Sequence, residues 1–277
     1  MSIQSAWGTL MNNYPKKNSG LDENCLIDLS HLGLIKITGL DAAKLLQGQL
    51  TCDVSEVTPT SSRLAAHCNP KGRIISLFQL FLYQDHYYLQ MPRTLIPIAL
   101  TALKKYAVFF KVELTDASDE LITIGYCGNQ LPQIMCDDHF VITQEGRYQI
   151  LGDMDSMTLL WKKIAEHTEV SDAEHWQYLK ISNYIPTIYP ETSEKFLPHE
   201  LNLPGLKAVS FNKGCYTGQE IIARMHYRGK LKTELKEHII ETDSTLIRGE
   251  DSAWGLIVDY CEINPNQYSV LSIIAKK

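Results

Sequence analysis

The chain is organised around Lys213-Gly214-Cys215-Tyr216-Thr217-Gly218-Gln219-Glu220, which runs into the apolar residues Ile221-Ile222-Ala223. Thr217 and Glu220 have the spacing of a capping box, in which a threonine at the helix start is followed three residues later by a glutamate. We therefore expect a helix with Thr217 as its N-cap. Cys215 then lies just before the helix N-terminus.

Two interpretations of Cys215 follow from this position. Free backbone N–H groups and the helix dipole favour an anion such as a thiolate, and a nearby lysine such as Lys213 favours it too. Cys215 is then a reactive thiol, and Gly214 and Gly218 let the backbone turn tightly and approach a ligand. In the other interpretation, a capped helix follows an ordinary buried cysteine, because free cysteines are often buried.

The composition is typical of a globular protein with a sizeable core. The 277 residues suggest about two domains, and 44% of them are hydrophobic and 21% charged. The net charge is 26 − 32 = −6. This balance argues against non-specific nucleic-acid binding, so we expect no direct nucleic-acid binding, although a local basic patch is compatible with it.

The cysteines indicate reduced thiols and no metal site. None of them forms a C-x-x-C pair, so neither a zinc knuckle nor a contiguous cluster motif is supported. The chain shows neither a secretory leader nor the roughly 18 apolar residues of a membrane span, and we expect a cytoplasmic protein. The seven cysteines are Cys25, Cys52, Cys68, Cys127, Cys136, Cys215 and Cys261.

Two successive strand–helix–strand–strand–helix patterns predict an α+β fold with two ferredoxin-like units. Residues 1–24 are polar and indicate a loose arm. The first pattern gives strands at 34–38, 64–68, 74–83, 87–91 and 108–114, with helices at 42–48 and 94–106. The second gives strands at 121–126, 140–143 and 148–151, with helices at 129–135, 155–165 and 172–183.

The last third of the chain predicts a connector and a small barrel. Residues 184–212 contain four prolines and form an irregular connector. After the helix that follows the octet, alternating strands at 231–241, 255–260 and 268–275 predict a small, partial β-barrel. The expected domains are 1–115 for the first unit, 116–228 for the second unit with the octet, and 229–277 for the barrel segment.

The octet resembles the K-G-C-Y-x-G-Q-E signature of the YgfZ-type family, the folate-binding, iron–sulfur-related relatives of the glycine cleavage T-protein. Further blocks in the matching order carry the same resemblance, and together they span roughly residues 25–230. They are Ile27–Gly33 with Ile37–Ala42, Leu46–Thr51 with Asp53, and Ala66–Arg73. The resemblance implies the T-protein-like folate-binding fold, with a C-terminal barrel that is short for the family.

The block after the first helix offers polar groups to a pterin. Gln47 and Gln49 supply amides, Thr51 a hydroxyl and Asp53 a carboxylate, which match the several donors and acceptors of that ring. The alternative is solvation of a helix end and loop, which are normally rich in such residues.

Three other positions complete the implied tetrahydrofolate site. Lys71 and Arg73 flank a hairpin glycine and offer cations to the glutamate tail, although a solvated turn explains them equally well. Trp176 is similar to the family's folate-stacking tryptophan, and a core tryptophan is the alternative. Leu32 stands where bacterial members carry a second tryptophan, and it offers an apolar wall.

T-protein's carboxylates are absent from the matching positions. Ile74-Ile75-Ser76-Leu77 replaces the stretch that carries the catalytic acid, and Lys180-Ile181-Ser182-Asn183 replaces the glutamate that grips the pterin. Aminomethyl transfer then lacks its expected general base. The residues therefore argue against a glycine cleavage role and leave open whether any reaction is catalysed.

The resemblance implies a protein that binds tetrahydrofolate or a derivative and supports the assembly or repair of iron–sulfur enzymes, including those that modify tRNA. Cys215 and Lys213 are the implied catalytic pair. The alternatives are a folate-dependent one-carbon transferase with an unknown acceptor, and a non-catalytic folate-binding scaffold. The other implied signature residues are Gly214, Tyr216, Thr217, Gly218, Gln219, Glu220 and Arg224.

Overall fold

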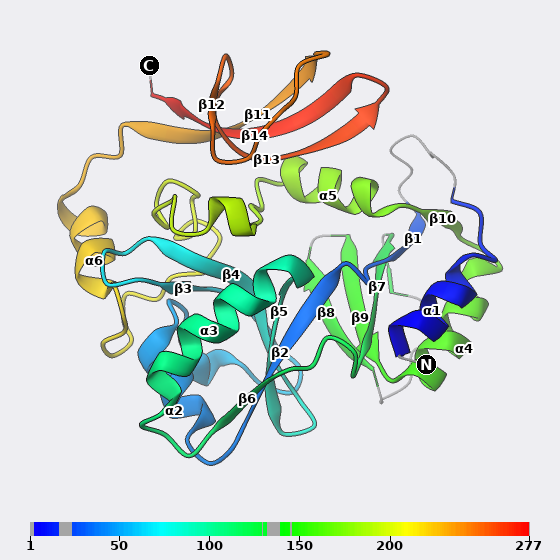
Figure 1. Ribbon diagram of the computed structural model, residues 1–277, viewed down its shortest axis with the longest axis horizontal. Coiled ribbons are helices and arrows are strands. Elements are labelled where there is room, and N and C mark those ends of the chain that lie inside the picture. The colour runs from blue at the N-terminus through cyan, green and yellow to red at the C-terminus, as the bar shows by residue number, and fades with distance from the viewer. Residues whose placement is uncertain (1–2, 17–23, 129, 132–138, 145, 277) are drawn as a thin grey trace.

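The computed structural model of the chain describes residues 3–16, 24–128, 130–131, 139–144 and 146–276. These residues form two five-stranded sheets and one four-stranded sheet, with helices between and around them. The four-stranded C-terminal sheet lies above α5 (Ala173–Ser182), at the top of Figure 1. The architecture is α+β, as predicted.

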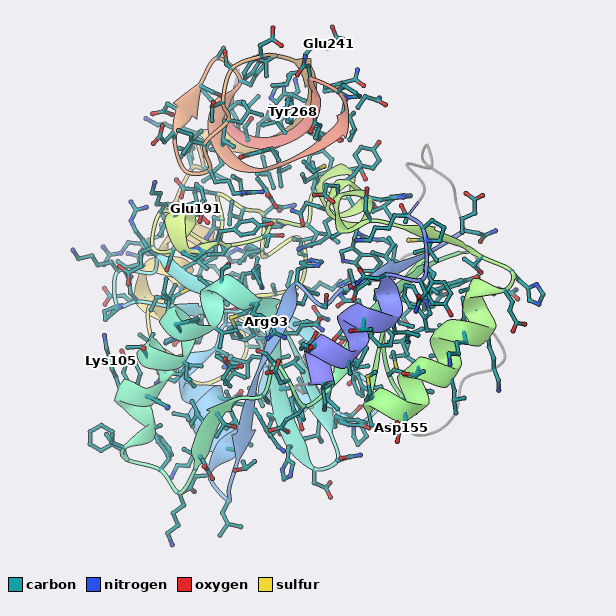
Figure 2. All side chains as sticks on the ribbon, turned by 45° about the vertical axis from the view of Figure 1, so that its right-hand side comes forward. Arg93, Lys105, Asp155, Glu191, Glu241 and Tyr268 are labelled. Atoms are coloured by element: carbon teal, nitrogen blue, oxygen red, sulfur yellow. The ribbon has the colours of Figure 1, made fainter. Side chains whose placement is uncertain are left out.

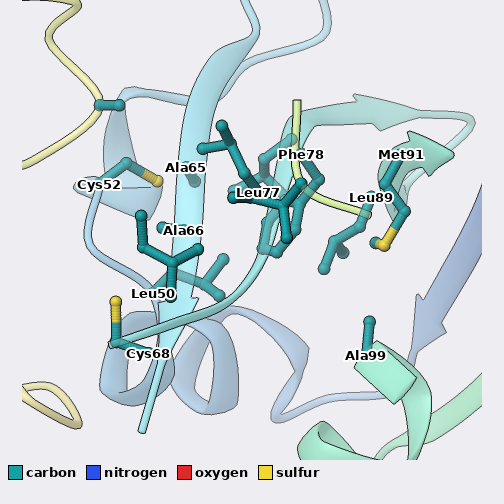
Figure 3. Packing of buried hydrophobic residues seen from close by; sticks show 14 of the residues in the cluster. Leu50, Cys52, Ala65, Ala66, Cys68, Leu77, Phe78, Leu89, Met91 and Ala99 are labelled. Carbon is teal, nitrogen blue, oxygen red and sulfur yellow. The ribbon is translucent and has the colours of Figure 1, made fainter. Parts of the chain in front are cut away.

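The first sheet has the strand order β3-β4-β5-β2-β6, and each neighbouring pair is antiparallel. Helix α3 packs on it, and its apolar side chains join the largest core cluster. Residues from several elements converge in this cluster, including Ala65, Phe78, Leu89 and Ala99 (Figure 3). The elements are β2 (Leu32–Thr38), α2 (Ala42–Gln49), η1 (Val54–Glu56), β3 (Arg63–Cys68), β4 (Ile74–Tyr83), β5 (His86–Pro92), η2 (Arg93–Leu95), α3 (Ile96–Ala107) and β6 (Glu113–Asp116).

The second sheet has the order β10-β1-β7-β9-β8 and draws one strand from the N-terminal segment. Strand β1 pairs with β10 in parallel and with β7 in antiparallel orientation. A buried aromatic cluster connects the two sheets, because Phe81 of the first stacks on Phe140 of the second at 4.8 Å. The elements are β1 (Cys25–Asp28), β7 (Ile122–Cys127), β8 (Phe140–Gln144), β9 (Arg147–Gly152), α4 (Met154–Ala165) and β10 (Glu169–Ser171).

Part of the predicted loose arm is a helix, α1 (Ile3–Met11). Trp7 is fully buried and meets Trp161 of α4 edge-on, with ring centroids 5.6 Å apart. The prediction was wrong here because the partner that orders this helix is distant in the sequence. The helix predicted at 129–135 lies largely outside the described residues.

The predicted strand at 74–83 is confirmed with the same bounds, whereas the one at 108–114 is wrong for its first residues. Strand β6 begins only at Glu113, because Val108 and Phe109 occupy a turn and are 75% and 82% exposed. The start of this strand was predicted too early because the prediction rested only on the apolar character of residues 108–110.

The C-terminal strands form a curled half-barrel, which confirms the predicted partial barrel (Figure 2). Its order is β11-β14-β13-β12, and a connector with one short 3-10 turn and α6 precede it. These elements are η3 (Pro190–Thr192), α6 (Gln219–Arg228), β11 (Thr233–Glu241), β12 (Asp251–Ser252), β13 (Gly255–Asn264) and β14 (Gln267–Ala275). Among the described helices, none combines the length and apolar character needed to cross a bilayer.

A buried ionic cluster connects the half-barrel to α5 and the connector. Asp259 of β13 is fully buried and accepts a hydrogen bond from Arg248 Nε at 2.9 Å, as well as one from Gln177 of α5. The Arg248 guanidinium lies over the rings of Tyr189 and Tyr260, at 4.1 and 4.4 Å from their centroids. Burial raises the pKa of Asp259 and the nearby Arg248 opposes this. The hydrogen bond from Gln177 and the contact of Arg248 with Tyr189 join the half-barrel to α5 and the connector.

His67 of β3 gives the fold a predictable dependence on pH. It is fully buried, and neither ring nitrogen has a hydrogen-bond partner among the described residues. Burial lowers its pKa from 6.5 to about 4, and Lys105 lowers it further. As the pH falls, the unfolded chain therefore binds the proton first, and stability is lost from about pH 6.5 down to about pH 4.

Between about pH 7 and pH 5, we expect the free energy of unfolding to fall by roughly 2 kcal/mol less in His67→Leu than in the wild type, because the variant lacks the buried imidazole. Urea unfolding at several pH values measures this directly. His167→Leu, at an exposed histidine, controls for the exchange itself. An unchanged pH dependence in His67→Leu would contradict the assignment.

Candidate functional site

The helix after the octet begins at Gln219, and its N-cap is Gly218 with a φ of 84°. No side chain caps it, so the predicted Thr217–Glu220 capping box is wrong. The Thr217 hydroxyl instead lies 3.0 Å from Oε1 of Gln49 and donates to it, while Glu220 pairs with Arg224 at 2.9 Å on the exposed helix surface. The Thr217 side chain therefore bonds a residue that is distant in the sequence and does not cap the helix.

The ammonium of Lys213 anchors the octet to the turn that follows α2. It is buried, and Nζ donates to the carbonyl oxygens of Leu50 at 2.8 Å and Cys52 at 2.7 Å. Burial lowers the pKa of Lys213 to about 8, and the nearby Cys52 and Asp53 oppose this. Both hydrogen bonds fix the position of the loop, and neither involves Cys215.

Cys215 is exposed, so the interpretation as an ordinary buried cysteine is wrong. The other cysteines in the described part of the chain are all buried: Cys25, Cys52, Cys68, Cys127 and Cys261. The octet therefore displays an accessible thiol on a loop whose neighbouring residues are fixed.

Close backbone contacts hold the octet against the β3–β4 hairpin. A Cβ atom added to Gly218 would lie 2.6 Å from the carbonyl oxygen of Asn69, and one added to Gly72 would lie 3.1 Å from Cβ of Ile221. The amide of Thr217 donates to the carbonyl of Gly48 at 3.2 Å. The structure thus brings the blocks at 46–53, 66–73 and 213–220 together.

The polar residues after α2 are mostly committed to partners within the protein. Gln47 donates to Asp53 at 3.0 Å and accepts from the amide of Val54 at 2.8 Å. Gln49 is buried and accepts from Thr217. Thr51 is also buried and donates to the carbonyl of Ala208 at 2.6 Å. Only Asp53 of this set lines the cleft described next.

A cleft of about 890 Å³ lies between the two sheets, the connector and α6. It continues into a narrower cavity, because Leu64, Gln79, Gln144 and Ile185 line both. Trp176 and Leu32 line the narrow part, so the structure brings these two predicted residues together. Other residues on the cleft wall include Asp53, Arg63, Arg147, Lys207, Phe211 and His226.

The flat aromatic wall of the narrow cavity has cations beside it, because Lys180 lines this cavity and Arg147 lines the adjoining wide cleft. The guanidinium of Arg147 lies 5.9 Å from the ring centroid of Trp176, and both residues are buried. Lys180 donates to Thr187, and burial lowers the pKa of this lysine to about 8 while Asp259 opposes the change. Burial, aided by Lys180, also lowers the pKa of His31 to about 4. The cavity wall is therefore suited to an anionic, planar ligand.

Sequence reasoning missed Arg147 and His31 as cavity residues. Each lines the cleft or the cavity together with residues of distant elements, for which the sequence carries no local signal. Lys180 did have a signal, because it begins the stretch that replaces T-protein's pterin-gripping glutamate.

The other predicted ligand residues lie elsewhere. Lys71 and Arg73 line a separate hollow with Tyr106 and Glu194, and Arg73 donates to the carbonyl of Lys195. The residues Ile74–Leu77, which replace T-protein's acidic stretch, are buried in β4. No group of three or more metal-ligating side chains occurs in the part of the chain that the structure describes.

The fold and the cleft define a protein of the GCVT class. Residues 22–137 match the GCVT N-terminal domain. The structure is similar to the glycine cleavage system aminomethyltransferase T from Bartonella henselae, with a TM-score of 0.67 and 15% identity over 91% of this chain and 78% of that one. This likeness concerns the fold.

Curated relatives identify the family more closely. The tRNA-modifying protein YgfZ of Colwellia psychrerythraea is 34% identical over 78% of this chain and 71% of its own length. The tRNA-modifying protein YgfZ of Yersinia enterocolitica is 32% identical over 83% of this chain and 76% of its own length. The chain belongs to the YgfZ family, as the four sequence blocks predicted.

The two octet glycines give a matched test of how the loop is held. Gly218→Ala places a Cβ in a left-handed conformation, which costs about 1–2 kcal/mol, and drives it into the carbonyl of Asn69. Gly214 has no atom within 4 Å of an added Cβ. We expect urea unfolding to show a loss of about 2 kcal/mol or more for Gly218→Ala and little change for Gly214→Ala. Equal effects would contradict the docking.

Proposed function

We propose that the protein binds tetrahydrofolate or a derivative in the cleft and supports tRNA modification by assisting iron–sulfur enzymes through Cys215. The observation that carries this proposal is the continuous cleft that ends on Trp176, with Arg147 on the wall of its wide part and Lys180 on the wall of its narrow part. The names of the YgfZ relatives support the link to tRNA modification. The GCVT domain supports a folate-type ligand.

The residues of the narrow cavity fit a pterin. Trp176 supplies a flat π-face, and Gln90, Gln149 and Gln177 supply amides for the donors and acceptors of the ring. Oε1 of Gln149 is buried and has no hydrogen-bond partner among the described residues. A ring N–H of the ligand would satisfy this acceptor, which otherwise costs free energy.

The acidic tail of the ligand fits the wider cleft. Arg147 and Lys207 line that part, and cations there attract the carboxylates of a glutamate tail. In this proposal they replace Lys71 and Arg73 in the tail-binding role, because those two residues line a different hollow.

Cys215 lies at the rim of the site, three residues after the cleft-lining Asn212. The anchored Lys213 and the docked Gly218 hold the loop on either side of the thiol. A thiol displayed in this way is suited to sulfur chemistry with a client protein or to contact with its iron–sulfur centre. The absence of T-protein's acidic stretch argues against aminomethyl transfer.

We expect tetrahydrofolate to quench the tryptophan fluorescence saturably, because a pterin stacked on Trp176 takes up its excitation. Trp176→Phe should lose most of the quenching, because the stacked fluorophore is removed, and should bind more weakly because the smaller phenylalanine ring covers less of the pterin. Trp254→Phe, in the C-terminal half-barrel, is the control. Absence of quenching at millimolar tetrahydrofolate would exclude a folate site.

We expect Cys215→Ala to abolish the protein's contribution to tRNA modification in cells that lack the native protein. Folding and tetrahydrofolate affinity should stay unchanged, because the Cys215 side chain is exposed. Mass spectrometry of modified nucleosides provides the readout. Full function of Cys215→Ser would remove the thiol role and favour a folate-binding scaffold.

A further inference from the structure

A strongly basic segment follows the octet in an otherwise acidic chain. Residues 221–233 contain four formal cations and no acidic residue, whereas the whole chain has a net charge of −6. The four are Arg224, Arg228, Lys230 and Lys232, and we call residues 224–232 the basic segment. It covers the second half of α6 and the linker to β11, which runs along the outer edge of the molecule (Figure 1).

The charges of the basic segment are available to a partner. Arg228, Lys230 and Lys232 are exposed and form no salt bridge with any residue that the structure describes. Arg224 makes only an exposed pair with Glu220, with side chains 64% and 82% exposed. Such a pair contributes little and is readily exchanged for a stronger anion.

An aromatic surface lies within the same segment. His226 stacks on Phe211 with ring centroids 3.8 Å apart, and Tyr227 meets His226 edge-on at 4.9 Å. Tyr227 is 70% exposed, so its ring is open to a stacking partner. Exposed aromatic rings among unpaired cations are the combination that binds unpaired bases and their phosphates.

We propose that the basic segment binds RNA, with phosphates on Arg224, Arg228, Lys230 and Lys232 and an unpaired base on Tyr227. The fitting partner is a structured RNA with a single-stranded loop, such as a tRNA. This inference deepens the proposed function, because it makes the RNA itself a direct partner. It also replaces the expectation of no direct nucleic-acid binding, since that expectation rested on the net charge and not on its distribution.

The basic segment lies near the cleft and the Cys215 loop. His226 and Phe211 belong to the aromatic surface and also line the wide cleft, together with Lys207. Helix α6 spans about 15 Å and carries the octet at its other end. An RNA loop held on the basic segment therefore lies close to both the mouth of the cleft and the Cys215 loop.

Binding of a labelled stem–loop RNA to the full chain, followed by fluorescence anisotropy at several salt concentrations, tests the proposal. Four phosphate contacts predict that affinity falls roughly 50-fold between about 50 and 200 mM salt. The double variant Lys230→Glu with Lys232→Glu should bind roughly tenfold more weakly or worse and show about half the salt slope. Tyr227→Ala should lose roughly tenfold, the effect of one stacked base.

A matched control has the same change in charge elsewhere. Lys162→Glu with Lys163→Glu alters two exposed lysines of α4, on the opposite side of the molecule (Figure 1), and should bind RNA like the wild type. Tetrahydrofolate quenching should be unchanged in all these variants. A failure of RNA binding is thereby distinguished from a failure of folate binding.

Three results would overturn the proposal. The first is no RNA binding by the wild type at low salt. The second is an equal loss in the two charge-reversed variants, which would locate binding elsewhere. The third is a combination of two observations. Heparin, an anion without bases, would compete as effectively as unlabelled RNA, and Tyr227→Ala would bind RNA as well as the wild type. That result would make the segment a site for an acidic partner of another kind.

Discussion

The buried ammonium of Lys213 is the interaction on which the arrangement of the site depends. It donates to the carbonyl of Leu50, a residue 163 positions away in the sequence, and to that of Cys52. Burying an ammonium is costly unless acceptors replace its water shell, and the lowered pKa of Lys213 reflects that cost. Two carbonyls at the end of α2 meet this requirement, so the path of the chain after α2 determines where Cys215 is displayed.

The cleft depends on a second constraint, the joining of two sheets that do not share strands. Phe81 and Phe140 stack across the junction, while Gln177 of α5 donates to Asp259 of the C-terminal half-barrel. Neither contact lies in the cleft itself. The cleft is lined by residues of the two five-stranded sheets, the connector and α6. The ligand site thus results from how these two sheets meet the connector and α6.

The distribution of charge decides what this site is suited to. The chain is acidic overall, yet Arg147 and Lys180 lie beside the cavity. Three further cations, Arg228, Lys230 and Lys232, are exposed at the outer edge of the molecule. The positions of T-protein's acidic stretch carry no carboxylate and are buried. Binding of anions is therefore favoured over proton transfer, which agrees with the proposed folate and RNA sites.

The sequence by itself determined the α+β class, the strand at Ile74–Tyr83, the half-barrel and the family, since periodicity, turns and motifs are local properties. Tertiary structure alone decided that Thr217 bonds Gln49 instead of capping α6, and that Trp7 orders an N-terminal helix. It also decided that Arg147 lies beside Trp176. Each of these rests on a partner far away in the chain, and a local pattern carries no information about which distant residue will compete for a side chain.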